Sequence, residues 1–186
     1  IEKSPSLPIS QVYLERLRQF QGASKLKKAI LSYLASRVTN EEIKENIHIF
    51  NQIDKNNDGY ITIKELQKGL AATSTKSKEE IETIMMSVDT DNNGAINFNE
   101  FIAATLDVSI YKDYSNLEKA FKFFDKDHDG EIDENELKGS LAGKEFKHID
   151  TKIFSSALGE TDSDQNGKVD FKEFLRCMST KFEKET

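Results

Sequence analysis

Four twelve-residue stretches of the chain carry oxygen-bearing side chains at the same internal positions. They start at Asp54, Asp89, Asp125 and Asp162, so that successive starts lie 35, 36 and 37 residues apart. In every stretch positions 1, 3 and 5 are Asp or Asn, position 6 is Gly and position 12 is Glu. A hard cation such as calcium prefers about six to eight oxygen ligands, at about 2.3 to 2.6 Å. The spacing therefore predicts four calcium-binding loops.

Each position in these stretches has its own task in holding a cation. Positions 1, 3 and 5 supply side-chain oxygens, position 7 supplies its backbone carbonyl, and position 12 supplies a carboxylate that binds through both oxygens. Position 6 requires a backbone angle that a residue without Cβ adopts most easily. The predicted ligands are Asp54, Asn56, Asp58, Tyr60 and Glu65 in loop one; Asp89, Asp91, Asn93, Ala95 and Glu100 in loop two; Asp125, Asp127, Asp129, Glu131 and Glu136 in loop three; and Asp162, Asp164, Asn166, Lys168 and Glu173 in loop four.

This ligand pattern is that of the EF-hand, and all four stretches are identified as EF-hand loops. The alternative for any stretch rich in Asp, Asn and Gly is an ordinary solvated turn. All four stretches also carry an apolar residue at position 8, which a solvated turn does not need: Ile61, Ile96, Ile132 and Val169. In paired EF-hands these residues lie side by side in a two-strand ribbon. We therefore expect Ile61 to face Ile96, and Ile132 to face Val169.

Helical patterns before and after the loops complete the helix-loop-helix units. Apolar residues recur there at spacings of three and four, which indicates helices with one buried face. Capping boxes predict where three of these helices begin. The pairs are Thr39 with Glu42, Ser77 with Glu80, and Ser115 with Glu118.

These elements predict an all-α fold of two EF-hand lobes, each with a short two-strand ribbon between its loops. We expect EF-hands 1 and 2 in an N-terminal lobe at 39–107, and EF-hands 3 and 4 in a C-terminal lobe at 108–186. Residues 1–9 contain both prolines and are interpreted as a linker. Residues 10–38 are predicted to form a long amphipathic basic helix.

The segment from Ser10 to Val38, called here the basic segment, differs in charge from the remainder of the chain. Its balance is +5, whereas that of Thr39–Thr186 is −12, so the two parts should attract each other. On a helical projection its apolar residues form two stripes, rotated by roughly a quarter turn. The stripes are Tyr13, Leu14, Leu17 and Phe20, and then Leu26, Ile30, Tyr33, Leu34 and Val38. The change falls near Gly22, which weakens a helix and is interpreted as a hinge.

The two stripes suit capture by a two-lobed clamp. Phe20 and Leu34 are 14 positions apart, about 21 Å along a helix. The alternative is a surface helix packed on the first lobe alone.

Composition excludes several other classes of function. A net charge of −7 argues against binding nucleic acid, whose phosphates would repel the chain. No apolar run is long enough for a transmembrane segment. The single Cys177 allows no internal disulfide, which favours a reducing, cytoplasmic setting, with any membrane association arising from parts outside this sequence. We expect Cys177 to be a buried packing residue, and the start at Ile1 suggests a piece of a longer chain.

The segment L-E-R-L-R-Q-F-Q-G-A-S-K-L-K-K-A-I-L-S-Y-L-A-S-R-V-T-N-E-E, from Leu14, leads directly into the four loops. This arrangement resembles the regulatory region of calcium-dependent protein kinases of plants and protists. The resemblance implies that a kinase catalytic domain precedes an autoinhibitory helix, and that a calmodulin-like domain follows it. It also implies that Ser10 to about Phe20 blocks the kinase active site at resting calcium, with Arg16 or Arg18 mimicking substrate.

The chain itself contains no kinase motif, such as a Gly-rich nucleotide loop, H-R-D or D-F-G. We therefore expect a non-catalytic regulatory fragment of a serine/threonine kinase. It should bind up to four Ca²⁺ and then capture its own basic helix, which would relieve inhibition of the catalytic domain. Two alternatives stay open: a free-standing calmodulin-like sensor that acts on a separate target, and a passive calcium buffer.

The loops differ in their number of carboxylates when position 9 is included. Loop three offers five, namely Asp125, Asp127, Asp129, Asp133 and Glu136, and loop four offers four. Loops one and two offer three each. Because affinity is tuned by ligand charge, we predict tighter calcium sites in the C-terminal lobe and the switching step in the N-terminal lobe.

Overall fold

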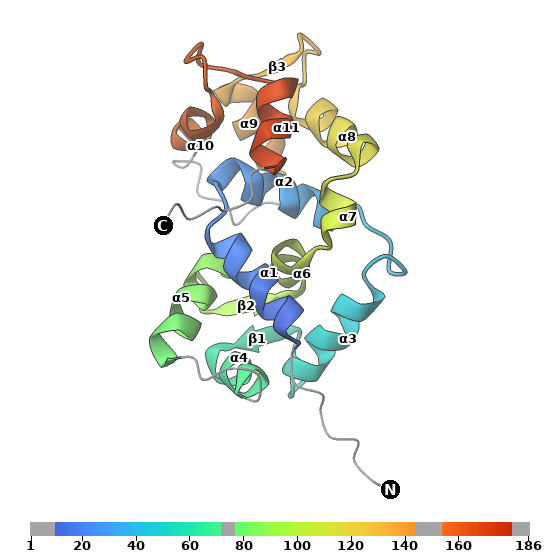
Figure 1. The fold of residues 1–186 in the computed structure, drawn as a ribbon, viewed down its shortest axis with the longest axis vertical. Helices are drawn as coiled ribbons and strands as arrows, with labels where there is room; N and C mark the ends of the chain where they lie inside the picture. The colour runs from blue at the N-terminus through green and yellow to red at the C-terminus, as the bar shows by residue number, and fades with distance from the viewer. Residues whose placement is uncertain (1–9, 72–76, 144–153, 180–186) are drawn as a thin grey trace, which may run out of the picture. The chain divides into compact units, whose positions relative to one another are not determined.

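The computed structural model of the chain describes residues 10–71, 77–143 and 154–179. They form two compact units, each built around one pair of helix-loop-helix motifs (Figure 1). The first unit combines the described residues up to Gln21 with Val38–Thr105, and the second combines Gly22–Arg37 with the described residues from Leu106 onward. The predicted all-α EF-hand fold with two-strand ribbons is confirmed. The linker predicted at 1–9 lies outside the described residues.

The first unit contains loops one and two. Its elements, in chain order, are α1 (Gln11–Gln21), α3 (Lys44–Ile53), β1 (Tyr60–Thr62), α4 (Ile63–Leu70), α5 (Lys78–Val88), β2 (Ala95–Asn97) and α6 (Phe98–Thr105). Strands β1 and β2 pair in antiparallel fashion with Ile61 opposite Ile96, as predicted. Both isoleucines are fully buried, so the ribbon ties the two loops to the apolar core.

The second unit contains loops three and four. Its elements are α2 (Lys25–Ala35), α7 (Val108–Tyr111), α8 (Tyr114–Phe124), β3 (Glu131–Ile132), α9 (Glu134–Leu141), α10 (Phe154–Thr161), β4 (Val169–Asp170) and α11 (Phe171–Ser179). The antiparallel pair of β3 and β4 places Ile132 opposite Val169, which confirms the second predicted pairing. None of the helices in the described part of the chain combines the length and the apolar character needed to cross a bilayer.

Helix starts are fixed by side chains that accept hydrogen bonds from unpaired backbone N–H groups. Ser77 caps α5 by accepting from the Glu80 N–H, as predicted. The Thr39 and Glu42 pair also forms its hydrogen bonds, although regular helix begins only at Lys44. The predicted start at Ser115 is wrong. Asp113 caps α8 instead by accepting from the Asn116 N–H, so Ser115 lies inside the helix.

The basic segment forms two helices rather than the single long helix predicted for 10–38. The first helix, α1, ends at Gln21, and the second, α2, begins at Lys25. Gly22 lies in the break, where a hinge was predicted. Ser24 fixes the restart, because its extended backbone ends the break and its Oγ accepts from the Lys27 N–H. This N-cap is a sequence signal that the helical projection missed.

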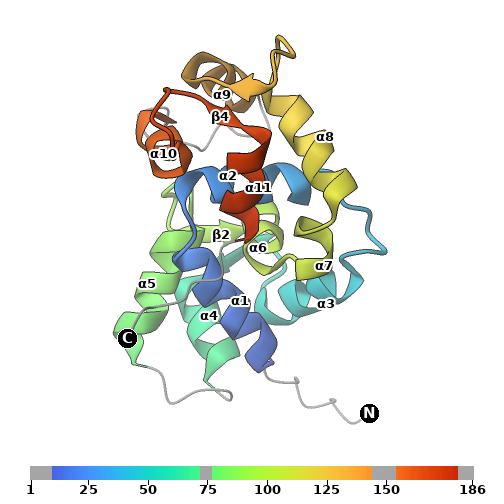
Figure 2. The ribbon, with the colours of Figure 1, turned by 45° about the horizontal axis from the view of Figure 1, so that its top comes forward.

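Each half of the basic segment is part of the core of one unit. The first stripe, Tyr13, Leu14, Leu17 and Phe20, is at most 3% exposed within the first unit, where α1 packs against α5 and α6 (Figure 1). In the second unit α2 packs against α8, α10 and α11, and Leu26 and Ile30 are fully buried (Figure 2). The alternative of a helix lying only on the surface of the first lobe is therefore wrong.

Candidate metal-binding loops

The four predicted loops share one backbone conformation. The glycine at position 6 has a φ of +83° to +87° in each loop, where a side chain would strain the backbone. Position 4 is also left-handed, with φ between 54° and 59°, at Asn57, Asn92, His128 and Gln165. The loop pattern predicts the left-handed glycines but not the left-handed residue at position 4. Asparagine tolerates a left-handed backbone, so Asn57 and Asn92 indicate this conformation from the sequence, whereas His128 and Gln165 do not.

The glutamate at position 12 closes each loop onto its own beginning. In loop one, Glu65 Oε1 accepts from the Lys55 N–H (N···O 3.0 Å), and Glu65 Oε2 accepts from the Thr62 N–H (2.9 Å). The equivalent glutamates accept in the same way in the other loops: Glu100 from Thr90 and Asn97, Glu136 from Lys126 and Asp133, and Glu173 from Ser163 and Asp170. The position 12 carboxylate thus accepts hydrogen bonds from the backbone at positions 2 and 9 in all four loops.

The aspartate at position 1 is a buried ligand candidate in three of the four loops. One oxygen of each accepts from the position 6 glycine, as in loop one, where Gly59 donates to Asp54 Oδ2 over 3.0 Å. Asp54, Asp89 and Asp125 are at most 7% exposed. Because a buried carboxylate needs a compensating positive charge or hydrogen bonds, these positions favour a bound cation.

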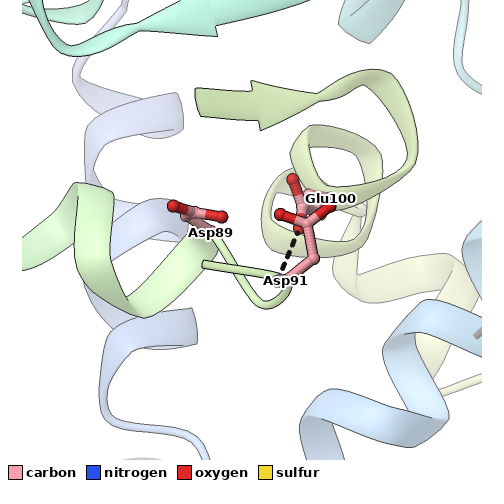
Figure 3. A group of neighbouring side chains, drawn as sticks. All are labelled: Asp89, Asp91 and Glu100. Atoms are coloured by element: carbon pink, nitrogen blue, oxygen red, sulfur yellow. Dashed lines mark hydrogen bonds between the residues drawn. The ribbon is translucent and has the colours of Figure 1, made fainter. Parts of the chain in front are cut away.

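Loop two gathers three acidic side chains, Asp89, Asp91 and Glu100, whose oxygens lie within 4.8 Å of one another (Figure 3). Figure 3 shows Glu100 joined to Asp91 by a hydrogen bond from the Asp91 N–H (3.3 Å). Burial raises the pKa of both Asp89 and Glu100, since the charged forms lose solvation. Equivalent groups form in loop three (Asp125, Asp127, Glu136) and loop four (Asp162, Asp164, Glu173).

The donor set and one unsatisfied oxygen fit calcium. Only oxygen ligands are grouped in these loops, the chemistry that hard cations select. Asp125 Oδ1 is buried and has no hydrogen-bond partner among the described residues. A buried, unpartnered carboxylate oxygen is costly, and a cation at this point of loop three would satisfy it. Loop one has Asn56 rather than an acidic residue at position 3, but the amide oxygen of Asn56 is still a usable ligand.

One side chain crosses between two loops in the second unit. Lys168, at position 7 of loop four, places its Nζ 3.0 Å from Asp129 Oδ2 and 3.2 Å from Glu131 Oε2 in loop three. This lysine holds the pKa of Asp129 below its ordinary range, and the hydrogen bonds to Asp129 and Glu131 raise the pKa of Lys168. The loop pattern predicts a role for Lys168 only through its backbone carbonyl.

In the first unit, polar contacts fix α1 at the end of α6. Arg16 Nη1 donates to the carbonyl oxygen of Thr105 over 3.0 Å. Asn46, on α3, donates to the same carbonyl over 2.9 Å, and Thr105 is fully buried. A cation at the C-terminal end of a helix is favoured by the helix dipole. Arg18 Nε also donates to Glu80 Oε1 on α5 over 3.1 Å, so α1 has polar contacts with both helices against which it packs.

In the second unit, α2 is held mainly by burial and aromatic contacts. The ring of Tyr33 stacks on Phe123 with centroids 4.4 Å apart. Lys27 is 7% exposed, its Nζ lies 5.5 Å from the centre of the Tyr111 ring, and burial lowers its pKa. Cys177 is half-buried, less than predicted, and its Sγ lies 3.4 Å from Ser24 Oγ. Burial raises the pKa of this thiol, which agrees with a packing role.

This geometry defines the class of protein. Residues 43–106 and 114–179 each match the family described as an EF-hand domain pair. The two matches cover most of the chain, one in each unit. The chain therefore belongs to the EF-hand family.

The relatives narrow the class further. The chain is 38% identical to calcium-dependent protein kinase 11 of Oryza sativa subsp. japonica, over 94% of this chain and 30% of that protein. It is also 38% identical to calcium-dependent protein kinase 2 of Zea mays and to calcium-dependent protein kinase 9 of Arabidopsis thaliana, over 92% of this chain and 33% and 31% of those proteins. The predicted resemblance is confirmed. The chain spans about a third of the length of these relatives.

Proposed function

We propose that this chain is a calcium-sensing regulatory domain that binds up to four Ca²⁺ and, on binding, captures its own basic segment. The capture would relieve inhibition of a serine/threonine kinase catalytic domain in the same parent protein. One observation carries the proposal: the two halves of the basic segment, α1 and α2, are each buried within a separate EF-hand pair. A passive calcium buffer does not need to bury a basic segment in its apolar cores in order to bind the ion.

The twenty ligand positions predicted from the sequence stay the proposed calcium ligands, five in each loop. Three loops support this with acidic groups whose oxygens lie within 4.8 Å of one another. Like charges about 4 Å apart repel by about 4 kcal/mol at an effective dielectric of 20. Bound calcium would supply the positive charge that offsets this repulsion.

The position 12 glutamates connect the loops to helix movement. Each lies in the first turn of the helix that follows its loop, so drawing its carboxylate toward the loop centre also moves that helix. In sensor EF-hands such movement opens the helix pair and exposes apolar surface. The apolar stripes of α1 and α2 are the proposed occupants of that surface.

The first unit and the kinase active site would compete for the same arginine side chains, and this competition gives the proposed release of inhibition a physical basis. Arg16 or Arg18 is the side chain expected to mimic substrate in the kinase active site. Here Arg16 donates to Thr105 and Arg18 pairs with Glu80, both inside the first unit. The same guanidinium groups cannot occupy a kinase site at the same time. Docking of α1 in the first unit would therefore withdraw it from the catalytic domain.

A two-piece binding experiment tests this proposal. Residues 39–186 would be titrated with a separate peptide of residues 10–38 by calorimetry, once with calcium and once with a chelator. We expect tight binding only with calcium, because the apolar surfaces open only then. Leu17→Glu in the peptide should abolish its contact with the first unit, since Leu17 is 1% exposed. Val12→Glu is the matched control, since Val12 is 55% exposed.

The same experiment separates the alternatives. Equal binding with calcium and with chelator would contradict a calcium-driven capture. No peptide binding, together with a calcium-dependent rise in hydrophobic-dye fluorescence, would favour a free-standing sensor. No dye response to calcium at all would favour a buffer.

A further inference from the structure

Lys168 connects the two calcium loops of the second unit through its side chain. Its Nζ lies 3.0 Å from Asp129 Oδ2, and the other oxygen of Asp129, Oδ1, accepts from the Glu131 N–H over 2.9 Å. Asp129 is the proposed ligand at position 5 of loop three. Both oxygens of this ligand are therefore already engaged, one of them by a full positive charge. A second contact, from Lys168 Nζ to Glu131 Oε2 (3.2 Å), holds the ammonium group at the loop.

The first unit lacks the residue that makes this contact. Position 7 of loop two, which corresponds to Lys168, is Ala95, and position 7 of loop one, which corresponds to Glu131, is Tyr60. The two ribbons have the same register, since Tyr60 faces Asn97 just as Glu131 faces Asp170. The geometry is thus comparable in the two units, and the difference lies in the side chain alone. Asp58 of loop one, the counterpart of Asp129, accepts from the neutral Asn56 amide (2.8 Å) instead.

We propose that Lys168 sets the calcium affinity of loop three, by placing a fixed positive charge on a ligand carboxylate and so weakening binding there. This inference rests on the proposed calcium-binding function. A divalent cation in loop three has to share Asp129 with the ammonium group or displace it, and it meets charge repulsion from Lys168 in either case. The five carboxylates of loop three would otherwise bind calcium most tightly of the four loops, and Lys168 partly offsets them.

Removing this charge should strengthen loop three measurably. A unit charge a few ångströms from a divalent cation, at a solvent-exposed site, changes affinity by about three- to tenfold. The side chains of Lys168 and Asp129 are 37% and 38% exposed, so the effect should shrink as ionic strength rises. Loops one and two lie in the other unit and should not respond.

The test uses the full 186-residue chain and calcium alone, in a titration followed site by site through backbone amide signals. The Gly130 amide reports on loop three, because it donates to Asp125. Lys168→Gln should raise the calcium affinity of loop three about three- to tenfold. Lys168→Arg keeps the charge and should stay close to wild type. Lys172 is an exposed lysine at position 11 of loop four, the loop that contains Lys168. Lys172→Gln removes an equal charge and therefore controls for net charge.

The converse variant places the contact in the first unit. Ala95→Lys would present an ammonium group to Asp58 and should weaken loop one by a similar factor. An unchanged or weaker loop three in Lys168→Gln, or an equal gain in Lys172→Gln, would overturn the role of Lys168 while leaving calcium sensing intact. No calcium uptake by the wild-type chain would overturn the proposed function together with this inference.

Discussion

The two units hold their halves of the basic segment by different means. In the first unit α1 buries one stripe and adds directed polar contacts, with Arg16 donating to the carbonyl of Thr105 and Arg18 to Glu80. In the second unit α2 is buried on most of its surface, with Tyr33 stacked on Phe123. Its hydrogen bonds to α10 lie at the exposed start of the helix, where Lys25 Nζ donates to Ser156 Oγ over 2.8 Å. Directed hydrogen bonds fix the register of a helix, whereas apolar burial mainly supplies stability. The comparison indicates that polar contacts fix the position of α1 in the first unit, whereas apolar burial mainly stabilises the packing of α2 in the second.

The loops differ between the units as well. The first unit has asparagine at both left-handed positions, Asn57 and Asn92, whereas the second has His128 and Gln165. The second unit has more carboxylates in its loops, and Lys168 offsets part of that charge. Backbone fit therefore favours the loops of the first unit, and charge favours those of the second.

The largest expected effect comes from removing a position 12 ligand in either unit. Glu173→Gln should eliminate strong binding at loop four, with a loss above the roughly 10- to 100-fold typical of removing an outer partner of a metal ligand. Glu65→Gln should do the same at loop one. In a site-resolved calcium titration, Glu173→Gln should remove an early step and Glu65→Gln a late one, because the second unit carries more ligand charge. The reverse order would contradict the predicted division between the lobes.

The next largest effect should come from truncating buried apolar side chains of α1 and α2. Leu17→Ala in α1 and Ile30→Ala in α2 remove side chains that are 1% and 0% exposed. Each should lower the free energy of unfolding by about 2 to 5 kcal/mol, since a core cavity is left behind. Urea unfolding measures the loss, and Val12→Ala on the exposed face of α1 is the control. A loss at Leu17 no larger than that at Val12 would show that α1 does not belong to the core of the first unit.

A smaller effect should separate the polar contact that positions α1 from the apolar burial that stabilises it. Arg16→Ala removes a charged donor to a buried carbonyl, a contact that contributes about 1.5 to 3 kcal/mol. We expect the 10–38 peptide to bind residues 39–186 about tenfold or more weakly, in calorimetry with calcium. Gln19→Ala, an exposed position of the same helix, is the matched control. If both variants bind like wild type, the contact with Thr105 does not position α1.

The loops and ribbons were predictable from the sequence because their physics is local. A glycine at position 6 and an apolar residue at position 8 act within twelve residues, and the pairing of Ile61 with Ile96 follows from them. The basic segment was harder to predict. Its two stripes were visible, but the break depends on Ser24 as an N-cap, and each helix finds its neighbours only in the folded unit. The Lys168 contact depends on where one long, flexible side chain lies between two loops, so the loop pattern does not predict it.

The smallest expected effect concerns the left-handed residue at position 4. Gln165 adopts a φ of 58°, which disfavours most side chains but suits asparagine. Gln165→Asn should therefore stabilise the second unit, by a few tenths to about 1 kcal/mol, without touching a proposed ligand. The converse, Asn57→Gln, should destabilise the first unit by a similar amount. Urea unfolding in the presence of a chelator measures both changes without a contribution from calcium. If Gln165→Asn raises the free energy of unfolding and Asn57→Gln lowers it, backbone fit at position 4 distinguishes the two units. Changes of the same sign would refute this explanation.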